Sequence, residues 1–133
     1  QASRAVIQQA MRETTGNTNL TVILALSYSG RREIVEASRN FGRDIEAGKL
    51  SADSLTIENY SRYLYTADIP DPDLLIRTSG EYRISNFLLW QLSYAEFYFT
   101  PTLWPDFTAE CFKTALEEYG KRERRFGLTE AVN

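Results

Sequence analysis

The apolar run Leu20–Leu26 constrains the fold of this chain more than any other stretch. It is rich in leucine and β-branched residues, and it is far too short to span a membrane. Such a run is typical of a strand buried on both faces of a parallel sheet. Gly30 follows, and the next residues have apolar side chains at helical spacing. The face that we expect to be buried contains Ile34, Ser38, Phe41 and Ile45.

The rest of the chain continues this alternation of short apolar runs and helical patterns. We expect helices at 2–14, 57–64 after the cap Thr56, 85–91 after the cap Ser85 and 108–124, and strands at 74–76 and 97–99. Alternation of this kind predicts an α/β fold with a mainly parallel sheet flanked by helices. With 133 residues, we expect a single domain that covers 1–133.

Composition excludes several classes of site. The chain has no histidine, which removes histidine general acid–base catalysis and every metal site that contains histidine. Cys111 is the single cysteine, so an internal disulfide is excluded and a metal would need oxygen ligands, as Mg²⁺ does. Lys plus Arg number 15 against 18 Asp plus Glu, a net charge of -3 that argues against a nucleic-acid partner.

The compartment is inferred from what the sequence contains. We find no signal-peptide pattern and no run long enough to be a transmembrane span. We therefore expect a cytoplasmic protein, with peripheral contact to the inner membrane as an alternative. The chain begins with Gln1 rather than Met, which we interpret as processing or as part of a longer protein.

Arginines follow the predicted strand 74–76, at the sheet edge where open α/β folds bind ligands. Arg77 and Arg83 offer two guanidinium groups, and Ser85 a hydroxyl at an expected helix start. These groups suit an anion such as phosphate, whose oxygens guanidinium groups bind in a bidentate manner. Gly80 lets the backbone bend close to such a ligand. The alternative, given equal weight, is an ordinary turn in which Arg83 pairs with Glu81.

Three further features carry weaker signals. Arg31 follows the first predicted strand, where it could reach the same anion or simply face solvent. Glu96 stands beside the aromatic run 97–99, so it needs either a cation such as Mg²⁺ or an arginine partner, the commoner solution. The basic run 121–125 complements the dipole of the last helix.

Several consecutive strings resemble the cis-prenyltransferases, the family of bacterial undecaprenyl diphosphate synthase. The strings are Asp73–Glu81, Arg83–Gln91, Tyr94–Phe99, Leu103–Phe107 and Arg122–Gly127. A match over so many consecutive positions is highly specific, and weaker similarity extends back to Gly16.

The resemblance implies roles for individual residues. Arg77, Arg83 and Ser85 would hold the diphosphate of isopentenyl diphosphate, with Arg31 beside them, and Glu96 would help to bind Mg²⁺. The Arg-x-Gly motif at 125–127, with Arg125 and Gly127, would reach the active site of the partner subunit in a homodimer.

Two departures qualify the resemblance. The family motif Asn-Tyr-Gly-Gly-Arg reads Ser27-Tyr28-Ser29-Gly30-Arg31 here, so roles for Ser27 and Ser29 are not implied. The N-terminal Asp-Gly-Asn-Gly-Arg motif is absent, and with it the family's aspartate, so the catalytic residue is unassigned. The chain therefore resembles the C-terminal half of such an enzyme.

The complete enzyme would condense isopentenyl diphosphate repeatedly onto farnesyl diphosphate, forming cis double bonds. Its product would be undecaprenyl diphosphate, which partitions into the membrane as the carrier lipid for cell-wall synthesis. We expect this half to supply the isopentenyl diphosphate site, to be inactive alone, and to dimerise or aggregate through surface that the missing half would cover. The alternatives are a non-catalytic partner subunit and a generic phosphate-binding α/β module.

Overall fold

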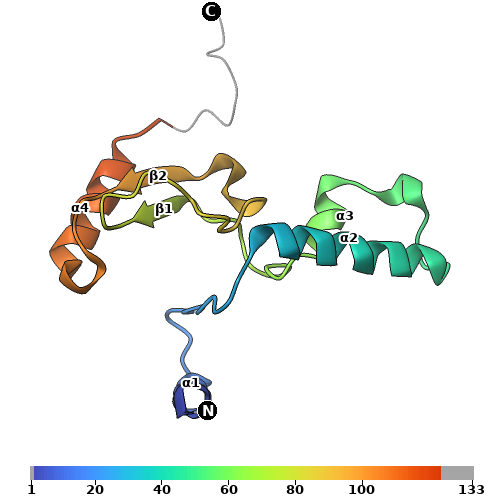
Figure 1. The fold of residues 1–133 in the computed structure, drawn as a ribbon, viewed down its shortest axis with the longest axis horizontal. Coiled ribbons are helices and arrows are strands. Elements are labelled where there is room, and N and C mark those ends of the chain that lie inside the picture. Colours follow the sequence, from blue (N-terminus) through green and yellow to red (C-terminus); the bar gives the residue numbers. More distant parts are fainter. Residues whose placement is uncertain (1, 124–133) are drawn as a thin grey trace, which may run out of the picture.

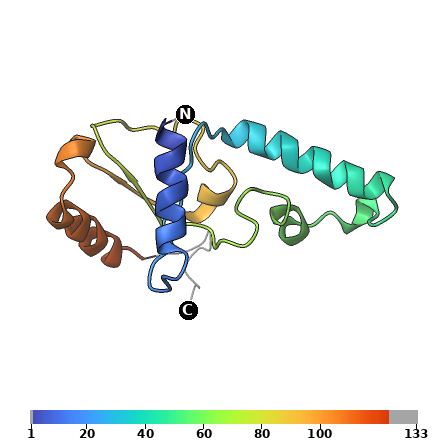
Figure 2. The same ribbon diagram turned by 90° about the horizontal axis from the view of Figure 1, so that it is seen from below.

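The computed structural model describes residues 2–123, in which helices and short strands alternate. The elements are α1 (Ala2–Thr14), α2 (Gly30–Glu46), α3 (Ile57–Ser61), β1 (Leu74–Arg77), β2 (Glu96–Phe99) and α4 (Ala109–Gly120), with 3₁₀ turns η1 (Ala52–Ser54), η2 (Gln91–Tyr94) and η3 (Trp104–Asp106). Figure 1 shows β1, β2 and α4 at one end of the molecule and α2 and α3 at the other. Figure 1 shows α1 apart from these two groups, and in Figure 2 it crosses the middle of the view, between them. The expected mixed α/β class is confirmed.

The sheet of the described region consists of β1 and β2, which pair in parallel. Leu75 lies opposite Phe97 and Ile76 opposite Tyr98, and α4 packs against β2. Both strands predicted from the sequence, at 74–76 and 97–99, are therefore present. Their parallel direction brings the carboxyl ends of both strands to one edge, where Arg77 lies opposite Phe99.

The α2–α3 group contains the hydrophobic cluster of Ala37, Tyr60 and Leu64, against which Trp90 packs. The ring centroids of Tyr60 and Trp90 are 4.9 Å apart. Side-chain oxygens cap both helices, as the sequence predicts for the second: Ser29 accepts from the backbone N–H of Arg32, and Thr56 from that of Asn59.

The buried face of α2 differs from the expected one. Its buried side chains follow the line Glu33, Ala37 and Phe41, whereas Ser38 is exposed, and Ile34 and Ile45 are partly buried. Spacing in the sequence favours the more apolar line, because a charged residue such as Glu33 is seldom buried. Burial of this carboxylate depends on hydrogen bonds from other segments, described below.

The predicted strand at Leu20–Leu26 is wrong, because this segment has no regular secondary structure. Val22, Leu24 and Leu26 are each more than 60% exposed, at 72, 64 and 67%. A strand needs a neighbour for its backbone N–H and C=O groups, and the described residues offer it no paired strand. The residues of this run favour a β-strand, but the described residues contain no strand that pairs with it.

The predicted helix at 85–91 is also wrong. Ser85, Asn86 and Leu88 have φ angles of 47°, 64° and 44°, in the left-handed region that interrupts a right-handed helix. Ser85 is therefore not a helix cap, and only the 3₁₀ turn η2 follows. The anion site proposed from the sequence loses its helix N-terminus.

The two outer helices form largely as predicted but bury little of their apolar faces. Val6 and Met11 of α1 are 68 and 65% exposed. Thr108 caps α4, which ends at Gly120 rather than near 124, a residue outside the described range. Ala115 is fully buried, while Phe112 and Leu116 are 49 and 45% exposed. None of the helices in residues 2–123 has the length and apolar character needed to cross a membrane.

Two glycines of α2 provide a matched test of packing. A Cβ at Gly30 would lie 2.9 Å from Leu89 Cγ and 3.0 Å from the Asn86 carbonyl oxygen, whereas a Cβ at Gly42 would have open space. We expect Gly30→Ala to lower the free energy of unfolding by about 1–3 kcal/mol. We expect Gly42→Ala to raise it by up to about 1 kcal/mol, because alanine favours helix. Urea unfolding of both variants measures the difference; equal effects would contradict the close approach at Gly30.

Candidate functional site

The first part of the site is the loop that leaves β1. Arg77 is the last residue of β1, and its carbonyl oxygen accepts from the Thr100 N–H at 2.9 Å. The Ser79 N–H donates to the Thr102 carbonyl at 2.8 Å and the Gly80 N–H to the Thr100 carbonyl at 2.9 Å. Ser79 and Gly80 have φ angles of 68° and 66°, which turn the chain tightly after the strand. The backbone after Arg77 is thus held against the segment that follows β2.

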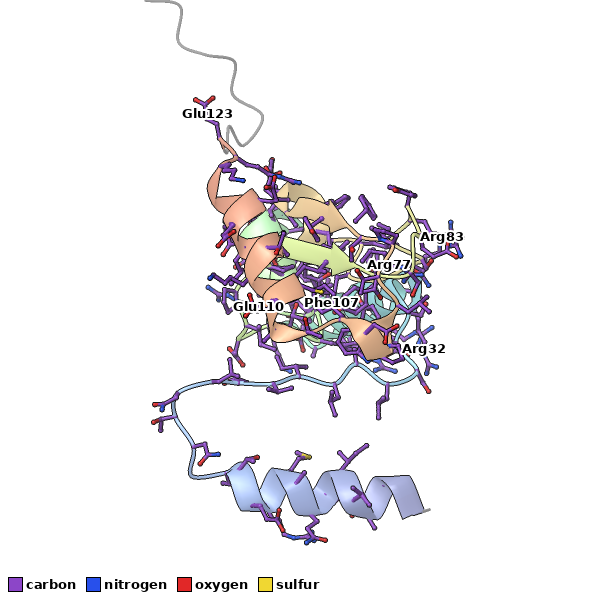
Figure 3. All side chains as sticks on the ribbon, turned by 90° about the vertical axis from the view of Figure 1, so that its left-hand side faces the viewer. Arg32, Arg77, Arg83, Phe107, Glu110 and Glu123 are labelled. Atoms are coloured by element: carbon purple, nitrogen blue, oxygen red, sulfur yellow. The ribbon has the colours of Figure 1, made fainter. Side chains whose placement is uncertain are left out.

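Arg77 and Arg83 lie on the same side of the fold in Figure 3, whereas Glu110 of α4 lies on the other. Arg83 pairs with Glu81, so the ordinary-turn alternative is partly realised. This pair is exposed on both sides, with 63% of the arginine side chain and 37% of the glutamate accessible. An exposed ion pair contributes little, so an anionic ligand could displace Glu81 at small cost. Among residues 2–123 the Arg77 guanidinium forms no ion pair or hydrogen bond.

Asn86 joins the segment 29–31, which contains Arg31, to the chain that follows β1. Its side-chain Oδ1 accepts from the Arg31 N–H at 2.9 Å, and its Nδ2 donates to Ser29 Oγ at 2.8 Å. Its carbonyl oxygen accepts from the Gly30 N–H at 2.8 Å. We call these three hydrogen bonds the Asn86 junction. They bring Arg31 and Ser85 to one place although the two residues are far apart in sequence.

A buried carboxylate lies in the first turn of α2, next to this junction. Glu33 is 1% exposed, and its Oε1 accepts from the Tyr65 N–H at 2.8 Å and from Gln91 Nε2 at 3.1 Å. The Tyr28 hydroxyl donates to Oε2 of the same carboxylate. Gln91 Nε2 also donates to Thr66 Oγ1 at 2.9 Å. These donors satisfy a group whose burial would otherwise be costly.

The Tyr28 hydroxyl is the group whose acidity changes most. Burial, followed by the hydrogen bond and the negative charge of Glu33, raises the pKa of Tyr28 well above its ordinary value. Tyr28 also packs edge-on against Phe87, with ring centroids 5.6 Å apart. At neutral pH it is therefore a protonated donor that ties the first loop to α2.

An apolar pocket of about 400 Å³ adjoins this network. It is bounded by residues 23–28, 65–72 and 87–91, including Tyr28 and Gln91. Gln91 Oε1 is buried without a hydrogen-bond partner in the part of the chain that the structure describes. The second half of the segment Leu20–Leu26, which has exposed apolar side chains, forms part of the lining of the pocket. Its lining is therefore mainly apolar, unlike the arginine loops.

Glu96 has the arginine partner that the sequence allowed. Arg122 Nη1 lies 2.8 Å from Glu96 Oε2, with the two side chains about one third exposed, at 35 and 28%. Within residues 2–123 no group of three or more acidic or cysteine side chains is placed to hold a metal. One carboxylate can still serve Mg²⁺, which commonly keeps several waters and takes substrate phosphate oxygens. The residues thus fit a shared Mg²⁺ site but not one built from the described residues alone.

The structure brings together some of the predicted site residues but not all. Arg31 meets the Ser85–Asn86 segment, and Arg77 and Arg83 belong to the adjoining loop. Glu96 starts the neighbouring strand β2 and forms an ion pair with Arg122. Arg125 and Gly127 lie outside the described residues.

Reasoning from the sequence misses Asn86, Glu33 and Gln91. The helical pattern at 85–91 hides Asn86, although asparagine is one of the residues that tolerate a left-handed backbone. Glu33 is charged, yet it lies four residues before Ala37 and eight before Phe41, on the buried line of α2. Ser29, to which the sequence assigns no role, both caps α2 and binds Asn86.

Known proteins are similar to this chain over most of its length. A family model described as "Putative undecaprenyl diphosphate synthase" matches residues 1–127. An isoprenyl transferase of Porphyromonas gingivalis is 53% identical over 126 residues, which cover 95% of this chain and 50% of that protein. A ditrans,polycis-undecaprenyl-diphosphate synthase of Coxiella burnetii, named as specific for (2E,6E)-farnesyl diphosphate, is 50% identical over 94% of this chain and 53% of its own length.

A solved structure shows the same fold. Lavandulyl diphosphate synthase from Lavandula x intermedia, in complex with dimethylallyl diphosphate, superimposes with a TM-score of 0.87 at 43% identity. The match covers 94% of this chain and 54% of that one. The chain thus spans about half the length of the curated relatives it matches.

The raised pKa of Tyr28 predicts how stability depends on pH. The protonated Tyr28 hydroxyl stabilises the folded chain, and this contribution is fully present below the pKa of an unfolded tyrosine, about 10. Above that pH the unfolded chain loses the tyrosine proton more readily than the folded chain, so the contribution to the free energy of unfolding is progressively lost. Tyr28→Phe removes the donor to Glu33, so we expect it to lower the free energy of unfolding by about 1–3 kcal/mol at pH 8. The difference from the unmodified chain should shrink towards pH 11.

Urea unfolding at both pH values measures this difference. Tyr82→Phe is the control, because the Tyr82 side chain is 76% exposed and should give no difference at either pH. A Tyr28→Phe difference that stays constant from pH 8 to pH 11 would contradict the assignment.

Proposed function

The chain belongs to the undecaprenyl diphosphate synthase family, and from this premise we propose that it supplies the isopentenyl diphosphate site of an enzyme that transfers prenyl groups. One observation carries the proposal. Arg77 stands at the carboxyl end of a parallel strand, and its guanidinium has no ion-pair partner among residues 2–123. A side chain so placed is available to an anion at the edge where α/β folds bind ligands.

Four residues form the proposed diphosphate site. Arg77 and Arg83 bind phosphate oxygens through their guanidinium groups, and Ser85 adds a hydroxyl. Arg31 approaches from the other loop, held there by the Asn86 junction. Arg83 exchanges its exposed partner Glu81 for the ligand. The helix N-terminus expected from the sequence has no part in this site.

The proposed reaction needs no histidine and no covalent enzyme intermediate. The diphosphate of an allylic substrate leaves, the double bond of isopentenyl diphosphate attacks the allylic carbon, and a proton is lost. This chain would hold the second substrate in position, and orientation of two bound substrates lowers the barrier substantially. Repetition on farnesyl diphosphate would give undecaprenyl diphosphate, the product class in the name of the Coxiella burnetii relative.

Glu96 is the residue of this chain that would contact Mg²⁺. When bound, the ion would neutralise charge on a leaving diphosphate. Glu96 would contribute one oxygen ligand, and Arg122 would move aside from the carboxylate that it contacts at 2.8 Å. The remaining ligands would come from water, phosphate oxygens and residues outside this chain.

The proposal extends to assembly and location. Arg125 and Gly127 would enter the active site of a partner subunit in a homodimer, as the family motif implies. A cytoplasmic enzyme with peripheral membrane contact suits a product that partitions into the membrane. A non-catalytic partner subunit is disfavoured, because Arg77, Arg83 and Ser85 are all present.

The site predicts binding that depends on Arg77. We expect the chain to bind isopentenyl diphosphate in the presence of Mg²⁺, and Arg77→Ala to weaken the binding at least about tenfold through the loss of a charge-assisted contact. Arg4→Ala, which removes the same charge from the exposed surface of α1, should leave the affinity unchanged. Calorimetric titration measures all three dissociation constants. Equal losses in both variants would show only nonspecific charge attraction.

The absence of the family's aspartate motif predicts a lack of turnover. The chain alone, given isopentenyl diphosphate, farnesyl diphosphate and Mg²⁺, should form no product above background, because it lacks the residues for the allylic diphosphate. Radiolabelled isopentenyl diphosphate and extraction of the lipid products provide the measurement. Formation of polyprenyl diphosphate by the isolated chain would refute this expectation.

A further inference from the structure

We infer that Asn86 and Ser29 are positioning residues that fix Arg31 and Ser85 in the geometry of the anion site. The inference rests on the proposed function, since it concerns the same diphosphate. It gives a positioning role to two residues that do not contact the ligand in the proposed site. Its basis is the Asn86 junction, the set of hydrogen bonds that Asn86 makes with Ser29, Gly30 and Arg31.

The junction uses almost every polar group of one residue. The Asn86 carbonyl, Oδ1 and Nδ2 bond in turn to Gly30, Arg31 and Ser29, at 2.8, 2.9 and 2.8 Å. The partners are separated from Asn86 by 55 and 57 positions for the two side-chain bonds. Since Oδ1 holds the Arg31 backbone directly, loss of the amide releases the residue whose guanidinium approaches the anion.

The backbone around Asn86 needs this support. Ser85 and Asn86 both have positive φ angles, 47° and 64°, a conformation that is unfavourable for serine although asparagine tolerates it better. Strained conformations of this kind persist only where surrounding contacts determine them. The Asn86 junction supplies those contacts, and so it also determines where the Ser85 hydroxyl lies.

Ser29 adds a bond that the resembled motif lacks. That motif has glycine at this position, whereas Ser29 Oγ here accepts from Asn86 Nδ2 at 2.8 Å and from the Arg32 N–H at 3.3 Å. One hydroxyl therefore caps α2 and orients the Asn86 amide. With Nδ2 bound to Ser29, Oδ1 is directed to the Arg31 N–H.

Packing around the junction leaves little freedom for either loop. Gly30 approaches Leu89 so closely that a Cβ would lie 2.9 Å from its Cγ. Beside it is an open pocket of about 210 Å³ lined by Arg31, Asn86 and Leu89. An anion held by Arg31 in this pocket would lie next to Asn86, so a change in the junction would alter the anion site directly.

The test compares four variants of the full chain of 133 residues. Asn86→Ala removes both side-chain bonds of the junction. Ser29→Ala removes one of them together with the cap of α2, and Ser29→Thr restores a hydroxyl at the same place. Thr56→Ala is the matched control, because it removes the N-cap of α3 without contact with either loop. Two properties are measured: amide hydrogen exchange at Gly30 and Arg31 by NMR, and the dissociation constants for inorganic diphosphate and isopentenyl diphosphate.

We expect Asn86→Ala to speed exchange of the Arg31 amide and to weaken diphosphate binding, each by about tenfold, as for the loss of one intramolecular hydrogen bond. Ser29→Ala should have a smaller effect of the same sign, and Ser29→Thr should return both properties to those of the unmodified chain. Thr56→Ala should change neither property, although it lowers stability. If Asn86→Ala fails to fold, the comparison of Ser29→Ala with Ser29→Thr tests the positioning role.

Different results overturn different parts. If the unmodified chain binds diphosphate and both Asn86→Ala and Ser29→Ala bind equally well, the positioning inference is wrong and the proposed function stands. If exchange at Arg31 is unchanged in these variants, the junction does not hold the loop. If no form of the chain binds either diphosphate, the proposed function fails, and the claim that Asn86 positions an anion site fails with it.

Discussion

The structure depends on the contact between the first turn of α2 and the segment 86–91. The main contacts between elements lie within two groups, α2 with α3 and β1 with β2 and α4. The groups meet where Gly30 bonds to Asn86, where Glu33 bonds to Gln91 at 3.1 Å, and where Trp90 packs on Tyr60. This contact joins the first turn of α2, which contains Arg31, to the segment that follows the loop of Arg77 and Arg83, because direct packing of α2 on the sheet is minor.

The contact is polar, and this gives it a defined geometry. Apolar surfaces can slide against each other, whereas a buried carboxylate with three donors has one satisfactory arrangement. Glu33 contributes specificity of this kind at the cost of burying a charged group. The chain thus loses some stability but fixes the position of the first turn of α2 relative to the segment 86–91. Proteins often make this exchange near a binding site.

Patterns within a few residues predict helices, caps and strands, and they fail where contacts with residues distant in the sequence determine the backbone conformation. The helices α1, α2 and α4, the cap Thr56 and both strands follow from periodicity and capping within a few residues. Leu20–Leu26 has the composition of a strand, but strand formation also needs a neighbour. At 85–91 the helical pattern is overridden because the Asn86 backbone bonds to Gly30, far away in the sequence. The positions of Arg77 and Arg83 after β1 could be predicted because ligand sites at strand ends follow from topology, whereas Glu33 and Gln91 are 58 positions apart and share no local signal.

The long sequence separation of these bonds has a consequence for how the chain folds. A bond between residues more than fifty positions apart closes a large loop, whose entropy must be lost before the bond contributes. The helices and their caps can form early from local contacts, while Asn86 and Gln91 can find their partners only after both groups have collapsed. The order of assembly would then place the arginine loops last, so that a folding intermediate rich in helix would have no affinity for diphosphate.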